Sequence, residues 1–166
     1  MKPRIHYLIL LSCLLVALPL MAETGYSQSL TSITESDIQA MLDGVDRAAR
    51  KGNVAGTIAP LAPDIKIKMT MSKAGSDKEV VGTITRDQYA FNFRQNMRRK
   101  LAYYYERKNT RIKIYDGQTA MVTSDIYETL KLRQGTIRAA SSEVAFINLR
   151  NGKLVITGVE ARVRFY

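Results

Sequence analysis

Histidine, cysteine and tryptophan are almost missing from this sequence of 166 residues, which has one His, one Cys and no Trp. Both His6 and Cys13 lie in the first 22 residues, so residues 23–166 have neither. Without these side chains, that part of the chain cannot provide a Ser-His-Asp or Cys-His nucleophile, a Cys/His zinc site, a haem ligand of either type or a disulfide. Its chemistry is limited to carboxylates, Lys, Arg, Tyr and hydroxyl groups, and we expect no metal and no cofactor.

The first 22 residues have the order of regions found in secretory signals. Lys2 and Arg4 precede an apolar stretch over residues 7–20, and Ala22 provides a small residue for cleavage. The polar residues that follow favour cleavage over an uncleaved membrane anchor, which needs about 20 unbroken apolar residues. A lipoprotein signal at Cys13 is a third alternative, although the apolar stretch continues past it. We expect an exported protein, periplasmic or secreted after cleavage near Ala22.

Basic residues exceed acidic ones, 25 Lys and Arg against 15 Asp and Glu, and the excess is concentrated between residues 86 and 113. The same stretch contains Tyr103-Tyr104-Tyr105, and aromatic residues among basic ones are typical of single-stranded nucleic-acid binding. An exported protein seldom meets nucleic acid, so we expect an anionic envelope surface as partner and no nucleic acid. A solvated cationic face without a partner is the simpler alternative. The predicted basic surface consists of Arg94, Arg98, Arg99, Lys100, Arg107 and Lys108.

The first half of the remaining chain has helical periodicity. Residues 23–34 are polar and without periodicity, which predicts a flexible lead-in to one domain over residues 35–166. Apolar residues at helical spacing follow a capping box made by Ser36 and Gln39, and Gly52 ends this helix. A short helical turn over residues 54–61 and a strand over 65–70 come next.

A second capping box begins at Thr85, and Tyr89 and Phe93 lie on the apolar stripe of the helix that follows. From Leu101 onward the hydrophobic period is two residues. Turn signals at Asp116-Gly117, Gln134-Gly135 and Asn151-Gly152 divide this part into four long strands. The predicted class is α+β, with N-terminal helices packed on a curved antiparallel sheet that ends in a four-strand meander.

The order of these pieces resembles the NTF2-like superfamily, in particular its SnoaL-like and ketosteroid isomerase-like members, which are cystatin-like α+β domains. The matching pieces are Leu61-Ala62-Pro63-Asp64-Ile65, Gly82 to Arg86, Tyr115 to Val122 and Asn151-Gly152-Lys153-Leu154. The resemblance covers about residues 36–166. It implies a cone in which helices and sheet enclose a pocket for a small apolar or amphipathic ligand, and a homodimer formed through the sheet.

The catalytic residues of the resembled enzymes have no counterpart in this chain. The isomerases have a general-base Asp in the strand after the first helices, and Met69 stands at that position here. The His of the dehydratases has no equivalent in residues 23–166. Because this fold hosts both enzymes and binding domains, the resemblance alone does not choose the function.

Strand alignment through the three turns predicts which polar side chains face the pocket. It places three carboxylates on the apolar face, Glu106, Glu128 and Glu143, with Glu128 opposite Tyr104 and Ser141 and diagonal to Glu143. Carboxylates about 5–7 Å apart in a partly apolar cavity repel each other, so one pKa rises and the pair can act as acid and base. Glu143 and Glu128 are therefore the candidate catalytic residues. The predicted ligand-binding residues are Tyr89, Phe93, Tyr104, Glu106 and Ser141.

A structural role for these carboxylates is the alternative. Arg94 or Arg98 could form buried ion pairs with them, and a single β-bulge would turn one Glu outward. Three classes of function remain open. We favour a non-catalytic exported domain that binds a small ligand in its cone or a protein partner through its sheet. The others are an isomerase, dehydratase or hydrolase that uses pocket carboxylates, and an envelope assembly protein with a basic surface.

Overall fold

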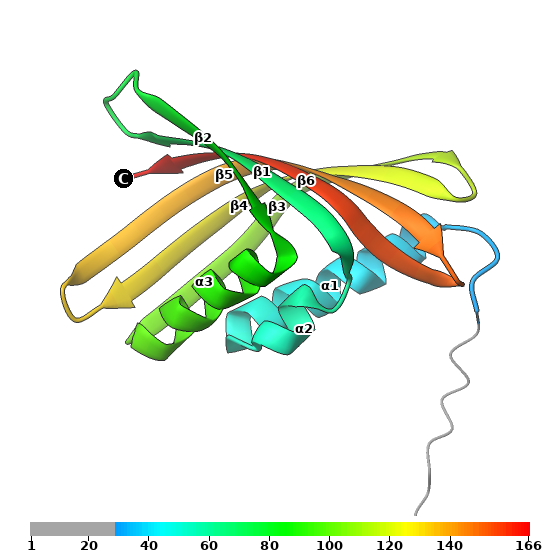
Figure 1. Ribbon diagram of the computed structural model, residues 1–166, viewed down its shortest axis with the longest axis horizontal. Coiled ribbons are helices and arrows are strands. Elements are labelled where there is room, and N and C mark those ends of the chain that lie inside the picture. The colour runs from blue at the N-terminus through cyan, green and yellow to red at the C-terminus, as the bar shows by residue number, and fades with distance from the viewer. Residues whose placement is uncertain (1–28) are drawn as a thin grey trace, which may run out of the picture.

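The computed structural model describes residues 29–166, in which three helices cover one face of a six-stranded curved sheet (Figure 1). The predicted signal over residues 1–22 lies outside the described residues. No helix within residues 29–166 is long and apolar enough to cross a membrane. The elements are α1 (Glu35–Lys51), α2 (Val54–Ile58), β1 (Leu61–Lys73), β2 (Glu79–Thr85), α3 (Arg86–Arg99), β3 (Ala102–Asp116), β4 (Thr119–Leu132), β5 (Gly135–Arg150) and β6 (Lys153–Phe165).

The sheet has the strand order β2-β1-β6-β5-β4-β3. Strands β3 to β6 form the predicted antiparallel meander. The prediction of a wholly antiparallel sheet is wrong at one pair, because β1 and β6 are parallel. The chain crosses from the β1–β2 hairpin to the far edge through α3, and the meander then returns strand by strand until β6 lies beside β1. The sheet is therefore mixed.

The first helix begins two residues before the predicted capping box. Thr34, not Ser36, is the N-cap: its hydroxyl accepts a hydrogen bond from the Asp37 backbone N–H at 3.2 Å, and the Asp37 carboxylate accepts one from the Thr34 N–H. Asp and Gln can both fill the third position of such a box, so the spacing alone left two registers open. The helix ends as predicted at Gly52, whose φ of 67° is left-handed.

The segment before α1 is attached to the sheet rather than free. The Leu30 N–H donates to the Gly152 carbonyl at 3.0 Å, and the Ile33 N–H donates to the Gly117 carbonyl at 2.8 Å. The Ile33 side chain is only 5% exposed. The predicted flexible lead-in over residues 23–34 is thus corrected for its described end, where an apolar side chain joins the core.

The core fills the α1 end of the space between helices and sheet, and a cavity occupies the α3 end. The predicted capping box of α3 is confirmed, since Thr85 and Gln88 exchange side-chain hydrogen bonds with each other's backbone. The largest fully buried side chains are Ile38, Leu42, Ile65, Ile126, Ile147 and Val122. Because α3 meets the sheet with only Ala90 and Phe93 buried, space remains beneath it.

Candidate functional site

A cavity of about 290 Å³ lies between α1, α3 and the inner face of the sheet. Its walls are largely apolar, and Met69, at the position of the isomerase Asp, is one of them. Thr57 of α2 lines it, and the other polar side chains that reach it come from α3 and from the meander. They are Asn92, Asn96, Tyr89, Tyr103, Tyr105, Arg107, Glu128, Ser141 and Glu143. This size is at the lower end of the range for small-molecule sites.

A β-bulge decides which side chains of β3 enter the cavity. Lys108 pairs with Asp125 and Arg111 with Thr123, so two residues of β3 stand opposite one residue of β4. Within the bulge, Asn109 has a left-handed φ of 52°, a conformation that Asn tolerates better than most residues. The extra residue reverses the alternation of inward and outward side chains before it.

The bulge corrects two predicted ligand-binding residues. Tyr104 and Glu106 face outward, with Tyr104 59% exposed and the Glu106 side chain 60% exposed. Glu106 instead forms a surface ion pair with Lys108 at 3.1 Å. The inward positions are taken by Tyr103 and Tyr105, which the sequence reasoning missed.

The two candidate catalytic carboxylates both line the cavity but are not diagonal neighbours. The β4–β5 turn is Arg133-Gln134, so Leu132 pairs with Gly135 and the register differs by two residues from the predicted one. An even shift keeps each residue on its predicted face. It moves Glu128 opposite Ala139 and leaves Glu143 four residues further along β5.

The β5–β6 hairpin also turns more tightly than predicted. Arg150 pairs with Lys153, and Asn151 and Gly152, with φ of 51° and 69°, form a two-residue turn. One irregularity between Phe146 and Ile147 then restores the alternation of faces, and Glu143 pairs with Ala161. Ser141 remains in the cavity wall, next to Ile126 rather than Glu128.

A buried ion pair closes one side of the cavity. The Arg107 guanidinium donates from Nε to both Asp46 oxygens at 3.0 and 3.3 Å, and its other nitrogens donate to the Ser124 hydroxyl at 2.7 Å and the Tyr105 hydroxyl at 2.9 Å. The side chains of Arg107 and Asp46 are 11% and 8% exposed. Since every nitrogen of the guanidinium has a partner, this network holds α1 against the sheet with its charge compensated.

Burial changes the protonation of both cavity carboxyls. It raises the pKa of Glu128 above its usual value, and a hydrogen bond from the Tyr103 hydroxyl partly offsets the effect. Burial likewise raises the pKa of Glu143; the Arg107 charge opposes this rise and the Glu128 charge adds to it. The only hydrogen bond to Glu143 within the described residues comes from Ser141 at 3.4 Å. Glu143 is therefore the cavity carboxyl with the greatest free hydrogen-bonding capacity.

The aromatic residues form the wall under α3. Tyr89 and Phe93, both predicted to bind ligand, line the cavity and stack at 6.3 Å between ring centroids. Phe93 also meets Tyr103 edge to face at 6.0 Å. Burial is the main cause that raises the pKa of the Tyr89, Tyr103 and Tyr105 hydroxyls, so all three stay protonated and can donate hydrogen bonds at neutral pH.

The predicted basic surface is divided among three places. Arg94, Arg98 and Arg99 are exposed on α3, with Lys100 half-buried at its end. Lys108 lies on the outer face of the sheet, whereas Arg107 lies in the cavity wall. Arg94 and Arg98 make no ion pair with the cavity carboxyls within the described residues, and Arg107 is the cation nearest to them in the cavity wall.

Asp46 was also missed by the sequence reasoning, although its position was informative. It is four residues after Leu42 on the apolar face of α1, and a carboxylate on such a face requires a partner. No group of three or more His, Cys, Asp or Glu side chains in residues 29–166 has the arrangement of a metal site.

No protein-family model matches the sequence, and no curated protein matches it. Solved structures do match. An NTF2-like protein from Cytophaga hutchinsonii is 14% identical with a TM-score of 0.60, covering 78% of this chain and 98% of that one. Hexachlorocyclohexane dehydrochlorinase LinA-type3 from Novosphingobium barchaimii is 15% identical with a TM-score of 0.56, covering 77% and 84%.

A third similar structure is a conserved protein from Planctomyces limnophilus, at 13% identity and a TM-score of 0.63, covering 80% of this chain and 97% of that one. At these identities the likeness shows the fold alone. The protein is thus an α+β cone of helices on a curved sheet. Its fold is that of the NTF2-like superfamily, as the sequence resemblance implied.

Proposed function

We propose that this domain binds a small neutral ligand in its cavity, with an apolar body and one oxygen that hydrogen-bonds to Glu143, and that it does so without catalysis. The observation that carries the proposal is a cavity of about 290 Å³ with mainly apolar walls and a limited set of polar groups on the helices and the meander. Such a combination gives affinity through apolar burial and orientation through a few polar groups.

The charges around the cavity favour a neutral ligand. Each nitrogen of the Arg107 guanidinium donates to Asp46, Ser124 or Tyr105, and the Asp46 carboxylate compensates its charge, so an anionic ligand would meet no unpaired cation in this wall of the cavity. Glu143 has only the long contact from Ser141. With its raised pKa it can be protonated and donate to a carbonyl, or be ionised and accept from a hydroxyl.

A second candidate is a proton-transfer enzyme in which Glu143 is the acid or base. The favouring observation is the same raised pKa in a group that opens into the cavity. One protein with a similar fold is named a dehydrochlorinase, so the same architecture is compatible with an elimination reaction in that protein. Within the described residues, Met69 stands where the isomerases have their Asp and no His lines the cavity, so we place binding first.

The proposal also includes the cell compartment. The signal pattern over residues 1–22 supports export, and a ligand carrier outside the cytoplasm needs no metal or cofactor for this role. The homodimer and the anionic envelope partner stay predictions.

The experiment is native mass spectrometry of the chain expressed with its own leader and recovered from the cell envelope. We expect a processed protein with an adduct that is lost on denaturation. Ala145→Phe, which fills the cavity, should remove the adduct and weaken binding of naphthol, a neutral aromatic alcohol, by at least about 10-fold. Ala140→Phe, at an outward position of the same strand, is the matched control and should leave both unchanged.

The outcomes separate the candidates. Loss of the adduct in both variants, or in neither, contradicts binding in the cavity. A different result would favour the enzyme. In that case the native protein converts the bound compound to a product of different mass, whereas Glu143→Gln retains the compound unchanged.

A further inference from the structure

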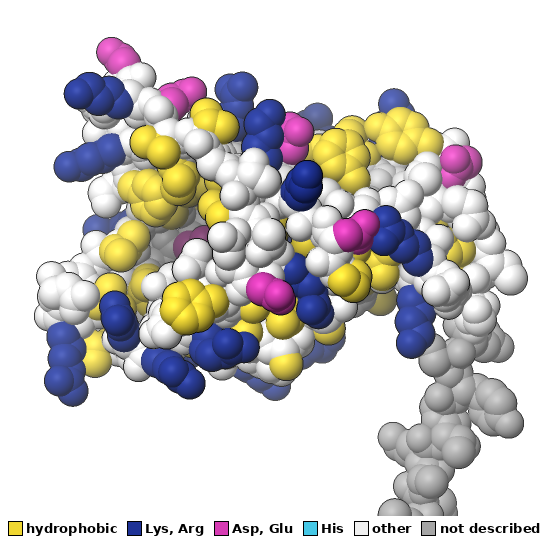
Figure 2. Space-filling model, viewed as in Figure 1, with side chains coloured by type: hydrophobic (Ala, Val, Ile, Leu, Met, Phe, Trp, Pro, Cys, Tyr) yellow, Lys and Arg dark blue, Asp and Glu magenta, His cyan; other side chains and the backbone are white. Residues whose placement is uncertain are grey.

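The outer face of the sheet is covered by no helix (Figure 1) and has an excess of positive charge, and Lys and Arg side chains are also spread over the side of the molecule that Figure 2 shows. By strand alternation, its central part has nine outward Lys and Arg side chains but only three carboxylates, Glu106, Asp125 and Glu160. This part comprises the outward positions of residues 66–72, 104–113, 121–131, 138–148 and 158–164. These outward Lys and Arg side chains do not line the inner cavity, because alternate residues of a strand face opposite sides of the sheet.

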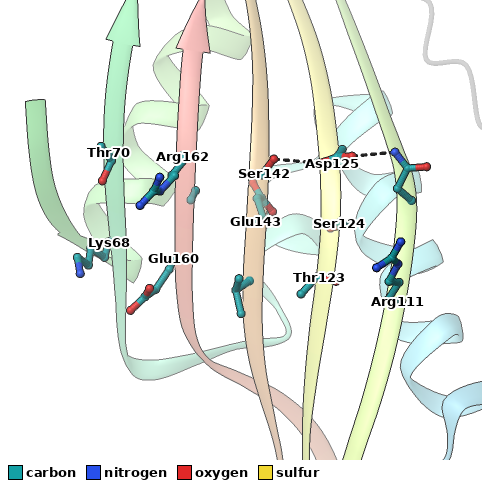
Figure 3. A pocket seen from close by; sticks show the side chains of 13 residues that line it. Lys68, Thr70, Arg111, Thr123, Ser124, Asp125, Ser142, Glu143, Glu160 and Arg162 are labelled. Carbon is teal, nitrogen blue, oxygen red and sulfur yellow. Dashed lines mark hydrogen bonds between the residues drawn. The ribbon is translucent and has the colours of Figure 1, made fainter. Parts of the chain in front are cut away.

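A groove of about 670 Å³ crosses this face from β1 to β3 (Figure 3). Lys68 and Arg162 lie toward its β1 side and Arg111 at its β3 side, and the strands between them carry hydroxyl groups. None of these three cations forms an ion pair within residues 29–166. A ligand that spans the groove would therefore meet cations at both ends.

The middle of the groove is built to accept hydrogen bonds. Asp125 accepts from the Asn109 side chain at 2.8 Å and from the Ser142 hydroxyl at 3.0 Å, which holds its pKa below the usual range and keeps it ionised. Glu160 and Glu143 also line the groove, and Glu143 lines the inner cavity as well, so three carboxylates lie among the three groove cations. Carboxylates accept hydrogen bonds from sugar hydroxyls, so this part of the groove suits a ligand that carries hydroxyl groups between its charged groups.

Three tyrosine rings on the outer face lie close to lysines, whereas Phe146, 41% exposed on the same face, has no cation over its ring within the described residues. Lysine ammonium groups lie over the three tyrosines: Lys108 over Tyr127 at 5.5 Å, Lys113 over Tyr115 at 4.9 Å and Lys131 over Tyr104 at 5.7 Å from the ring centroid. Base stacking requires a free ring face, whereas one face of each of these three rings makes a cation–π contact with a lysine. This arrangement disfavours single-stranded nucleic acid and favours a ligand recognised through its charge and hydroxyls.

Two other occupants fit less well. A second copy of the chain packed symmetrically on this face would place like charges against each other. A flat bilayer surface would contact the rim but not the carboxylates and hydroxyls within the groove. We propose that the outer face of the sheet binds an extended acidic polysaccharide, with Lys68, Arg111 and Arg162 contacting its charged groups and Asp125 and Glu160 accepting from its hydroxyls.

The test compares two sets of substitutions with the same change in charge in the full chain. Lys68→Gln/Arg111→Gln/Arg162→Gln removes the groove cations, and Arg94→Gln/Arg98→Gln/Arg99→Gln removes three exposed cations of α3. The probe is polygalacturonate, and binding is measured at low and physiological salt. The groove variant should lose about 10-fold in affinity or more, and the α3 variant about 2-fold or less. Thermal unfolding confirms that both variants fold.

Equal losses in the two variants would reduce the effect to net charge and overturn the site. Tighter binding of a single-stranded oligonucleotide or of vesicles containing anionic phospholipid would assign the face to that partner instead. A native protein that fails to bind polygalacturonate, or that forms a dimer in which binding and dimerisation compete, would also overturn the proposal.

Discussion

The two faces of the sheet give opposite environments to the same kind of side chain. On β4, Asp125 faces outward and Glu128 faces inward, three residues apart. Hydrogen bonds from Asn109 and Ser142 lower the pKa of the exposed Asp125, whereas burial raises the pKa of Glu128. The difference shows that the side of the sheet, more than the residue type, decides whether a carboxyl is a fixed charge or a group that can exchange a proton.

The same contrast applies to the cations of β3. Arg107 faces inward, where each nitrogen of its guanidinium donates a hydrogen bond and Asp46 compensates its charge, while its neighbour Lys108 is half exposed in a surface pair. Inward charges therefore contribute to holding the helices on the sheet. Outward charges are free to meet a partner.

The largest expected effect comes from breaking the inward ion pair. Arg107→Met leaves the buried carboxylate of Asp46 without its cation, which should lower the free energy of unfolding by about 3–5 kcal/mol. Lys108→Met is the matched outward control, with a loss of about 1 kcal/mol or less. Urea denaturation measures both.

A double variant distinguishes the lost ion pair from lost packing. Asp46→Asn combined with Arg107→Met should recover a large part of the stability, because no unpaired charge remains inside. If the double variant is as unstable as Arg107→Met alone, the network does not act through charge compensation.

The next effect is on the pH dependence of stability, and it should have opposite signs for a carboxyl variant on the inner face and one on the outer face of the sheet. The folded state raises the pKa of Glu143 above 4.5, so its contribution to stability is present at low pH and lost as the pH rises through the folded pKa. Glu143→Gln cannot ionise. Its stability relative to the native protein should increase with pH across that window, by up to about 1.4 kcal/mol per unit.

Asp125→Asn is the outward counterpart. Because the folded state lowers the pKa of Asp125 below 3.8, its contribution is present above that value and lost as the pH falls through the folded pKa. This variant should therefore be less stable than the native protein at neutral pH and equal to it in strong acid. Thermal unfolding from strong acid to neutral pH measures both carboxyl variants, and slopes of the same sign would contradict the contrast between the faces.

The smallest expected effect concerns the bulge that separates the faces. Asn109→Val forces a β-branched residue to a φ of 52° and removes the hydrogen bond to Asp125, which should cost about 1–2 kcal/mol. Asn109→Gly tolerates the backbone conformation and should cost less than half as much. Urea denaturation compares them, and equal losses would assign the effect to the lost hydrogen bond alone.

The sequence predicted the layers of this fold better than the faces of its strands. The periodicity of α1 and α3 and the three turn signals led to the correct elements because each is a local pattern. In β4, Val122 and Ile126 alternate with polar residues, so the inward face there could be read. The stretch Tyr103 to Lys108 has no such alternation: aromatic and charged residues occupy both faces.

The pocket was therefore only partly predictable. Glu128, Glu143 and Ser141 were placed on the correct side, because errors of two residues in register leave the face unchanged. Tyr89 and Phe93 were placed by the apolar stripe of α3, which is a local helical pattern. Tyr104 and Glu106 were misplaced by one bulge, whose sole local sign is an Asn in a strand of otherwise ordinary residues. Turn length and bulges depend on the pairing of distant strands, which the sequence does not display.

The central position of β6 in the sheet determines the order in which the strands can pair during folding. The last strand along the chain lies between β1 and β5, so the hairpin of β1 and β2 cannot join the meander until residues 153–165 are available. Until then, β1 and β5 each present an unpaired edge that can capture another chain. A chain growing from the ribosome can make the helices and hairpins early, but closes its sheet only at the end of synthesis. We expect such a chain to stay open long enough to rely on chaperones that cover exposed strands.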